Sequence, residues 1–313
     1  MDVEKSLIRI LKCIECSSNK LKLKAKSKSN SIIDGKVVCG KCGNYYSVKK
    51  GILIALPKKL DSFTKSEKKI SEKLSNVVYI EHSQSRSVMT FYNNLGKYMD
   101  NFKKITSIVE IGCGNGFFLE YLNGKKPAFK LIAGTDLSFN ALLNARKRTG
   151  LDNFINADSN NLPIADNVFD NVAMQGVIHH ISSVQSTILE IKRILKKKGI
   201  VAIQDINFNN FIIPFVDKVI LKMLLKKAGE ATLVKNPVSH GKLVKLLAKG
   251  GFKINSFKFH DVIAWPSSLI LDFLRLDKNY ILSSLILFDN ILSKIPLISN
   301  VFSWRYTVIA QKN

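Results

Sequence analysis

Two cysteine pairs near the start of the chain have the residue types and the spacing of a metal site. Cys13 and Cys16 form one Cys-x-x-Cys pair, and Cys39 and Cys42 form a second pair after 22 intervening residues. Each such turn presents two thiolates on one side of a tight loop, and two turns complete the tetrahedron that Zn²⁺ prefers. Because four protein ligands leave no open position for water or substrate, we predict a structural zinc.

A disulfide pair and redox-active thiols are the alternatives for these cysteines. A fifth cysteine, Cys113, makes the count odd, and the first residues lack the sustained apolar stretch of a secretory signal. Both observations weigh against disulfides, and two matched pairs weigh against a redox dithiol. The start of the chain also leads us to expect a cytoplasmic protein.

A glycine-rich loop further along the chain has the composition of a ligand-binding turn. Gly112, Gly114 and Gly116 stand between an expected strand and an expected helix, where glycines let the backbone turn tightly and approach a ligand. The spacing is G-x-G-x-G, which differs from the G-x-G-x-x-G of a dinucleotide site. Glu110, just before the loop, would repel a phosphate and attract an ammonium group.

Two more carboxylates follow the next two expected strands. Asp136 comes about twenty residues after the loop, where an acidic residue can accept hydrogen bonds from both ribose hydroxyls. Asp158 follows the third strand and would lie at the same sheet edge, within reach of an adenine amino group. Carboxylates for an amino acid, a ribose and an adenine together describe S-adenosylmethionine.

The elements that must position these residues follow the pattern of an α/β protein. From residue 105 onward, apolar runs of strand length alternate with helical spacing, which indicates βαβ units and a mostly parallel sheet. We expect strands at 107–111, 131–135, 154–156, 171–174, 200–204, 252–259 and 306–311, and helices at 116–122, 139–147, 184–195 and 240–248. Residues 1–57 read as a small β-rich module that ends at Pro57.

Residues 105–205 resemble the class I S-adenosylmethionine-dependent methyltransferases, in particular the methyltransferase type 11-like branch. The resemblance rests on the E-x-G-x-G-x-G loop, a later D-x-x-x-L-P segment, and Phe-Asp at the start of the fourth strand. It implies a Rossmann-like, seven-stranded, mostly parallel sheet with helices on both faces, and S-adenosylmethionine as co-substrate. The cofactor-binding residues that it implies are Glu110, Gly112, Gly114, Gly116, Asp136, Leu137, Asp158, Ser159, Gln175 and Gly176. An NAD-dependent oxidoreductase is the competing assignment.

Residues 1–57 are similar to the zinc-ribbon-like domains of some rRNA guanine methyltransferases and to small zinc proteins that activate tRNA and protein methyltransferases. The four cysteines and the exit 51–57 carry this likeness. Those rRNA enzymes have a proline-containing segment after the fourth strand, whereas 177–181 here resembles the small-molecule and lipid branch. We therefore expect a small or lipid-like acceptor, with an RNA methyltransferase as the first alternative and a non-catalytic binding or activator protein as the second.

The resulting division of the chain has three parts: the module 1–57, a linker with helices at 58–104, and a methyltransferase domain at 105–313 with substrate-cap insertions at 206–239 and 260–303. Charged residues interrupt the apolar C-terminal third, so we expect no transmembrane segment. His179 or His180, at the end of the fourth strand, could serve as a base for a hydroxyl acceptor, but a packing role is the alternative. His240 and His260 border the insertions and are further candidates.

The net charge of +24 is concentrated at the two ends of the chain. Residues 1–60 carry 14 basic and 4 acidic side chains (+10), and 206–313 carry 15 and 6 (+9), whereas 105–205 carry 11 and 9 (+2). Basic ends suggest an acidic partner, either nucleic acid, with RNA as one possibility, or an anionic membrane surface. Only seven of the 48 basic residues are Arg, so a lysine-rich solvated surface is the alternative.

Overall fold

A computed structural model describes residues 7–28, 31–82, 95, 107–124, 129–213, 236–263 and 279–313. Its strands are β1 (Leu21–Lys28), β2 (Ser31–Cys39), β3 (Tyr45–Lys49), β4 (Ile52–Ile54), β5 (Ser107–Ile111), β6 (Leu131–Asp136), β7 (Phe154–Asn156), β8 (Phe169–Gln175), β9 (Leu195–Ile206), β10 (Phe252–His260) and β11 (Arg305–Lys312). Its helices are α2 (Ser62–His82), α4 (Phe117–Gly124), α5 (Phe139–Thr149), the 3₁₀ turn η1 (Ile178–His180), α6 (Val184–Ile194), α9 (His240–Lys249), α11 (Asn279–Leu292) and α12 (Pro296–Phe302). The strands and helices expected between residues 107 and 311 are thus present.

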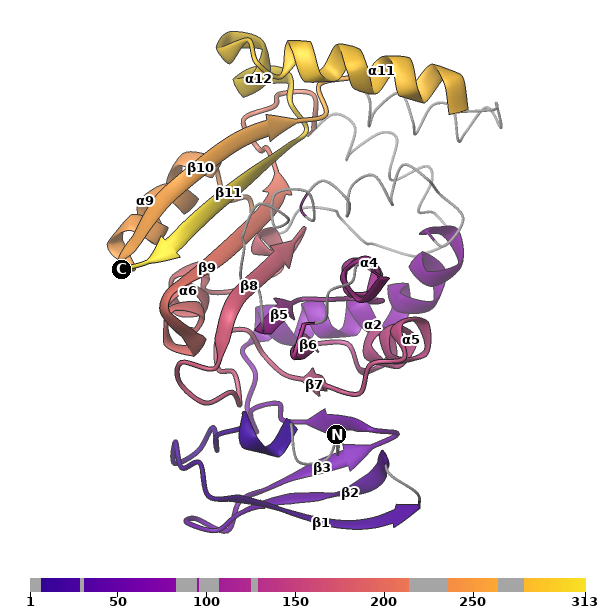
Figure 1. Cartoon of the computed structure of the whole chain (residues 1–313), viewed down its shortest axis with the longest axis vertical. Coiled ribbons are helices and arrows are strands. Elements are labelled where there is room, and N and C mark those ends of the chain that lie inside the picture. Colours follow the sequence, from indigo (N-terminus) through magenta and orange to yellow (C-terminus); the bar gives the residue numbers. More distant parts are fainter. Residues whose placement is uncertain are drawn as a thin grey trace.

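The described strands form one sheet in the order β1-β2-β3-β4-β7-β6-β5-β8-β9-β11-β10. From β4 to β9 the pairs are parallel, while β11 runs antiparallel to β9 and β10. Figure 1 shows this sheet twisting from the β1–β3 hairpins at one end to β10 and β11 near the other. The α/β class is confirmed.

The expected seven-stranded sheet and the small N-terminal module are joined in the structure, where seven of the described strands, in the order β7-β6-β5-β8-β9-β11-β10, lie within residues 105–313. The short strand β4 pairs in parallel with β7, with Ile52 opposite Phe154 and Ile54 opposite Asn156. The four N-terminal strands therefore continue the sheet to eleven described strands. Strand β4 offers an unpaired edge next to β7, and pairing the two edges satisfies backbone groups that each would otherwise leave to solvent.

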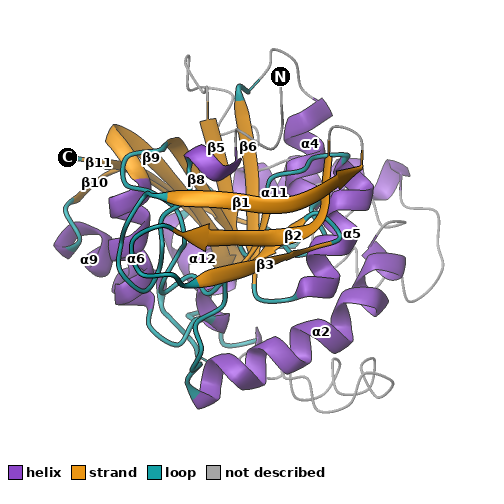
Figure 2. Ribbon diagram, turned by 90° about the horizontal axis from the view of Figure 1, so that it is seen from below, coloured by secondary structure: helices purple, strands orange, loops and turns teal. Residues whose placement is uncertain are grey.

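Alternate residues of the central strands supply the cores on the two faces of the sheet. On β5, Ile108 packs with Phe118 and Leu142 of α4 and α5, whereas Val109 and Ile111 pack with the α6 side. This alternation follows from the two-residue period of a strand. Figure 2 shows helices on both sides of the sheet, with α6 and α9 on one side and α4 and α5 on the other. The two covered faces explain why apolar residues point to both sides of these strands.

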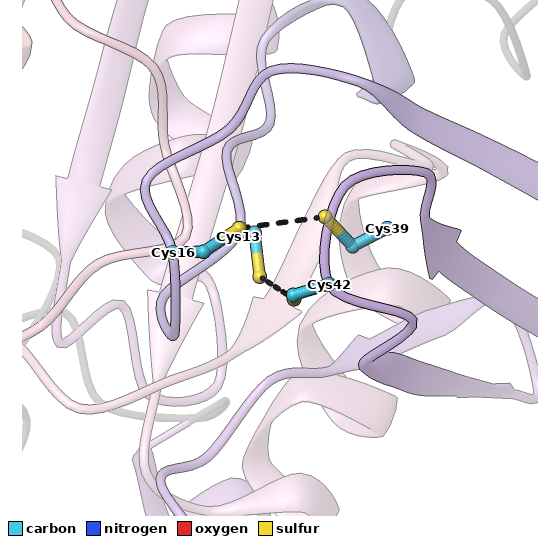
Figure 3. Close-up of side chains that lie close together, drawn as sticks. All are labelled: Cys13, Cys16, Cys39 and Cys42. Atoms are coloured by element: carbon cyan, nitrogen blue, oxygen red, sulfur yellow. Dashed lines mark hydrogen bonds between the residues drawn. The ribbon is translucent and has the colours of Figure 1, made fainter.

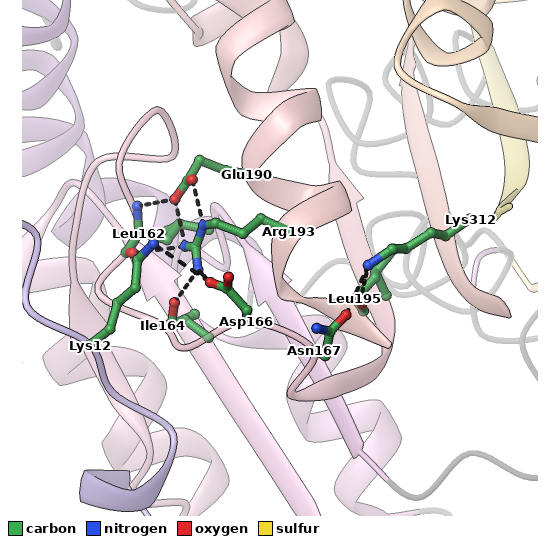
Figure 4. A network of polar contacts seen from close by, with 9 residues as sticks. All are labelled: Lys12, Leu162, Ile164, Asp166, Asn167, Glu190, Arg193, Leu195 and Lys312. Carbon is green, nitrogen blue, oxygen red and sulfur yellow. Dashed lines mark hydrogen bonds and ion pairs between the residues drawn. The ribbon is translucent and has the colours of Figure 1, made fainter. Parts of the chain in front are cut away.

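An arginine-centred network attaches the start of the chain to the loop that follows β7. The guanidinium of Arg193 makes a bidentate contact with Glu190 at 2.7 and 2.8 Å and also donates to Asp166 Oδ1 at 2.7 Å. It donates further to the carbonyls of Leu162 and Ile164 (Figure 4). Residues 10–12 add two backbone hydrogen bonds to this loop, from Ala165 N–H to the Ile10 carbonyl and from Lys12 N–H to the Pro163 carbonyl.

No helix among the described residues is both long enough and apolar enough to cross a membrane. Much of the insertion expected at 206–239, and residues 264–278 of the other insertion, lie outside the described residues. The described part of the second insertion folds as α11 and α12.

The first prediction concerns Arg193, whose side chain is only 17% exposed. Arg193→Ala would remove the guanidinium that donates to Glu190, Asp166 and two carbonyls, so we expect the free energy of unfolding to fall by about 3 kcal/mol. Chemical denaturation measures this. The matched control is Lys196→Ala, whose ammonium pairs with Asp170 at the surface and whose loss should cost about 1 kcal/mol or less. Equal losses for the two variants would contradict the network's role.

Candidate functional site

A cavity of about 380 Å³ lies at the carboxyl ends of β5, β6 and β8. Nine of the ten residues expected from sequence to bind a cofactor line it: Glu110, Gly112, Gly114, Asp136, Leu137, Asp158, Ser159, Gln175 and Gly176. The tenth, Gly116, instead permits helix packing, since a Cβ there would lie 2.8 Å from the Cβ of Ala145 on α5. The structure therefore brings residues from four segments of the chain to one place.

The glycine loop owes its shape to positive φ angles and to two tight contacts. Gly112 has φ +72°, and a Cβ on it would come within 2.4 Å of Val177. The N–H groups of Gly112 and Cys113 both donate to the Thr135 carbonyl, at 2.7 and 3.0 Å. Gly114 has φ +50° and open space where its Cβ would be. Side chains at these positions would strain the turn or occupy the cavity.

Glu110 is the most unusual group of the cavity wall. It is 2% exposed, and its Oε2 atom has no hydrogen-bond partner among the described residues. Burial and the nearby charge of Asp136 raise its pKa well above the ordinary value. The amide atoms of Gln175, on the neighbouring strand, also lack partners in the described chain. Because buried polar atoms are nearly always paired, these atoms indicate a polar ligand.

Asp136 uses both of its oxygens to hold the backbone around the cavity. Its Oδ2 accepts from Gly114 N–H and its Oδ1 from Ser138 N–H, both at 2.8 Å. Burial raises its pKa, while these two N–H groups act in the opposite direction. The pKa of Asp158 is likewise raised by burial, and its Oδ1 accepts from Asn160 N–H at 2.9 Å. Each carboxylate retains lone pairs for a ligand's hydroxyl or amino group.

Helix α2 forms a wall of the cavity that sequence reasoning missed. Its lining residues are Thr64, Glu67, Ile70, Ser71, Leu74 and Ser75. Glu72 anchors the helix by accepting from the N–H groups of Phe139 and Asn140 and from the Ser138 hydroxyl at the start of α5. A carboxylate is well suited to a helix N-terminus because unpaired N–H groups meet there. Asp61, which accepts from Thr64 N–H at 2.8 Å, was the available sequence signal of this helix start.

The four histidines considered from sequence have different surroundings. His180 lines the cavity, and its Nδ1 lies 2.8 Å from Oε2 of Glu67 on α2. His179 is 3% exposed, and its Nδ1 contacts Asp205 Oδ1 at 2.6 Å. His240 and His260 are not among the cavity-lining residues; His240 packs on aromatic rings, and burial lowers the pKa of His260 to about 4.

The four cysteines of the N-terminal part of the chain converge. The sulfur atoms of Cys13, Cys16, Cys39 and Cys42 all lie within 4.8 Å of one another (Figure 3). The two turns face each other, with 3.7 Å between the sulfurs of Cys13 and Cys42 and 3.6 Å between those of Cys16 and Cys39. The N–H of Lys41 points to the sulfur of Cys39 at 3.4 Å. Four soft donors in this arrangement fit a tetrahedral Zn²⁺.

Comparisons with known proteins agree with this geometry. Residues 109–203 match the family model described as a methyltransferase domain, so the chain contains such a domain. The chain is 36% identical over 95 residues to a malonyl-[acyl-carrier protein] O-methyltransferase of Legionella pneumophila, covering 29% of this chain and 33% of that protein. It is 30% identical over 114 residues to a ubiquinone/menaquinone biosynthesis C-methyltransferase of Desulfotalea psychrophila, covering 35% and 46%. The chain thus spans less than half the length of these two relatives.

Among solved structures, one similar chain comes from the complex between the Haloferax volcanii Trm112 methyltransferase activator and a methyltransferase. The TM-score is 0.50 at 15% identity, and the match covers 77% of this chain and 96% of that one. At this identity the likeness shows the fold, which is that of class I methyltransferases, and nothing finer.

Proposed function

We propose that this chain, which contains a methyltransferase domain, transfers the methyl group of S-adenosylmethionine to a small or lipid-like acceptor. One observation carries the proposal: the unpartnered carboxylate of Glu110 faces a cavity formed by a glycine loop and two further carboxylates. A nucleoside that carries a cationic amino acid has an ammonium group and hydroxyl groups that can donate hydrogen bonds to these carboxylates. A cavity of about 380 Å³ is also within the usual range for a ligand of this size.

The lining residues fit the parts of S-adenosylmethionine one by one. Glu110 would accept from its ammonium group, Asp136 from its ribose hydroxyls, and Asp158 with Ser159 from its adenine amino group. Gly112 and Gly114 would let the backbone approach the methionine part, while Leu137, Gln175 and Gly176 complete the pocket. A dinucleotide fits less well, because a buried carboxylate beside the loop would repel its diphosphate.

The co-substrate supplies an activated methyl group, so the protein's task is mainly alignment and exclusion of water. Helix α2 contributes to this task, because Ile70 and Leu74 present apolar surface to the cavity. Holding two reactants in line can lower a barrier by roughly 7 to 11 kcal/mol. We propose that residues 105–313 form the catalytic domain and that 206–239 and 260–303 contribute to the acceptor site.

Two findings support a lipid-like acceptor. The relatives described above are named for malonyl-[acyl-carrier protein] and for ubiquinone and menaquinone biosynthesis. Exposed apolar side chains gather on α11, α12 and the loop between them: Leu287, Phe288, Ile291, Ile295, Leu297 and Phe302. In Figure 1 these helices lie at the end of the molecule toward which β8 and β9 point. Such a surface suits an apolar acceptor or peripheral contact with a membrane.

An RNA acceptor is the second candidate, and one feature favours it. Lys22 and Lys24 are exposed on β1, and Lys24 lies opposite Lys36 of β2. Lys36 Nζ stands 4.7 Å from the ring centroid of the exposed Tyr45. Like charges facing each other across a strand pair are unfavourable unless an anion neutralises them, and an aromatic ring can stack on a base.

We also propose that the four cysteines hold a structural zinc. Cys13 follows Lys12, which is bonded to the loop 162–166, so the metal would stabilise the join between the N-terminal strands and the rest of the sheet. Short segments with a small core depend on such a ligand for folding.

The second prediction tests the donor site. Isothermal calorimetry should detect binding of S-adenosylmethionine, and Glu110→Gln should weaken it roughly 30-fold, which is the loss of about 2 kcal/mol expected for one charged hydrogen bond. The matched control is Glu120→Gln, because Glu120 pairs with Arg148 on the helices outside the cavity. Absence of binding to the folded wild-type protein would refute the proposed function.

The same titration has an expected pH dependence. A cationic ligand favours the ionised form of Glu110, whose pKa in the free protein is raised. Binding should therefore release a proton, and affinity should increase as the pH rises toward that raised pKa. Glu110→Gln should lose this part of the dependence.

The third prediction concerns the acceptor. When the protein is incubated with methyl-labelled S-adenosylmethionine and fractionated cell extract, the label should enter the organic phase. The double variant Lys22→Glu/Lys24→Glu should transfer label as well as wild type, because these side chains lie on β1 and do not line the cavity. Label in RNA, sensitive to added salt and lost in the double variant, would select the second candidate.

The fourth prediction concerns the metal. Atomic emission should find one zinc per chain in the wild-type protein. Cys39→Ser should lower the zinc content toward zero and lower the melting temperature, because one of four ligands is lost. Cys113→Ser, which removes a cysteine outside the cluster, should retain the metal. A full complement of zinc in Cys39→Ser would show that the cluster does not hold it.

A further inference from the structure

The imidazole of His180 has two nitrogens in different surroundings. Nδ1 contacts the Glu67 carboxylate at 2.8 Å, whereas no described residue hydrogen-bonds to Nε2. The side chain is 38% exposed and lines the cavity. A carboxylate on Nδ1 fixes the proton there and leaves Nε2 as a lone-pair acceptor, which is the arrangement of a general base.

The adjacent His179 is arranged for a different role. Its side chain is 4% exposed, its Nδ1 contacts Asp205 at 2.6 Å, and its ring lies 4.1 Å from the ring of His180. The other oxygen of Asp205 accepts from the Ile178 N–H at 2.7 Å. Asp205 therefore holds both the 3₁₀ turn η1 and the ring of His179, which packs against the ring of His180.

We propose that His180 accepts the proton that the methyl acceptor loses, and that Glu67 positions its ring for this step. This inference rests on the proposed function and deepens it, because it specifies the acceptor's chemistry. The acceptor atom must carry a proton that has to leave, as in a hydroxyl, a hydroquinone or an amine. A carboxylate is already ionised at neutral pH and would gain nothing from a base.

As the acceptor atom bonds to the methyl carbon, its proton passes to Nε2 of His180. The electron pair of the breaking carbon–sulfur bond stays on sulfur, whose positive charge is thereby lost. The positive charge now resides on the imidazolium, where the Glu67 carboxylate neutralises it. No oxidant, reductant or metal is required.

The charges around His180 match this role. Burial lowers its pKa below the ordinary value, so that the ring is neutral before reaction, and the positive form of His179 would act in the same direction. Glu67 on α2 and Asp205 on β9 act oppositely and favour the charged form after the proton has arrived. The ring is thus neutral before the reaction, and both carboxylates stabilise it once the proton has arrived.

The fifth prediction has a part that needs no acceptor. Nitrogen-15 NMR of the full chain, with the His180 signals assigned by their loss in His180→Gln, should show the neutral ring protonated on Nδ1. Glu67→Gln should lower the pKa of His180, because a favourable negative charge is removed. A proton on Nε2 in the neutral wild-type ring, or an unchanged pKa in Glu67→Gln, would overturn the proposal.

The rate measurements use the extract fraction that accepts label. With saturating donor, His180→Gln should reduce kcat by roughly 10²- to 10⁴-fold, while the Kd for S-adenosylmethionine stays near the wild-type value. Glu67→Gln should move the inflection of the kcat profile to lower pH. His240→Gln, the same substitution outside the cavity, is the matched control and should leave kcat unchanged.

The chemistry of the labelled product supplies the remaining test. Label that withstands mild alkali, as an ether, an amine or a carbon-bound methyl group does, agrees with a protonated acceptor. Label released as methanol indicates a methyl ester, hence a carboxylate acceptor, and overturns the inference. Wild-type turnover by His180→Gln also overturns it but leaves the proposed function intact, whereas absence of donor binding by wild type defeats the proposed function and the inference with it.

Discussion

The carboxylate of Asp136 is the interaction on which the cavity depends. One oxygen accepts from the loop after β5 at Gly114 and the other from Ser138 at the start of α5. The Ser138 hydroxyl in turn donates to Glu72 of α2. Three separate elements are thereby held around one buried charge. A buried carboxylate is costly unless it is hydrogen-bonded, so loop, helix and charge support one another.

Mutual support between contacts also explains how the N-terminal strands are joined to the domain. Strand β4 has only three residues, yet it pairs along its whole length with β7, which is equally short. The pairing of two such short strands contributes little stability by itself. The Arg193 network and the hydrogen bonds of residues 10–12 stabilise the loop beside them, and the cysteine cluster begins one residue later at Cys13. The join is thus made by several weak contacts that reinforce one another.

Much of this arrangement could be predicted from sequence, for physical reasons that differ between residues. Strands such as β5 are buried on both faces and therefore appear as mostly apolar runs, and the carboxyl ends of parallel strands meet at one edge, which brings Glu110, Asp136 and Asp158 together. The place of α2 could not be predicted, since it depends on Glu72 meeting the N-terminus of α5 some 66 residues away. The pairing of β4 with β7 is equally non-local. Nor could sequence separate His179 from His180, because their partners Asp205 and Glu67 lie on other elements.

The cavity is lined by acidic side chains, although the chain as a whole carries a net positive charge. The protein carries a formal charge of +24, yet the cavity is lined by Glu67, Glu110, Asp136 and Asp158. Burial and the charge of Asp136 raise the pKa of Glu110, and burial with the charge of Glu72 raises that of Asp136, so keeping these carboxylates ionised costs free energy. A cationic ligand removes that cost, whereas an anionic one would increase it. A proton arriving at His180 beside Glu67 is subject to the same field, so the charges that favour a positive donor also favour the imidazolium formed when the acceptor loses its proton.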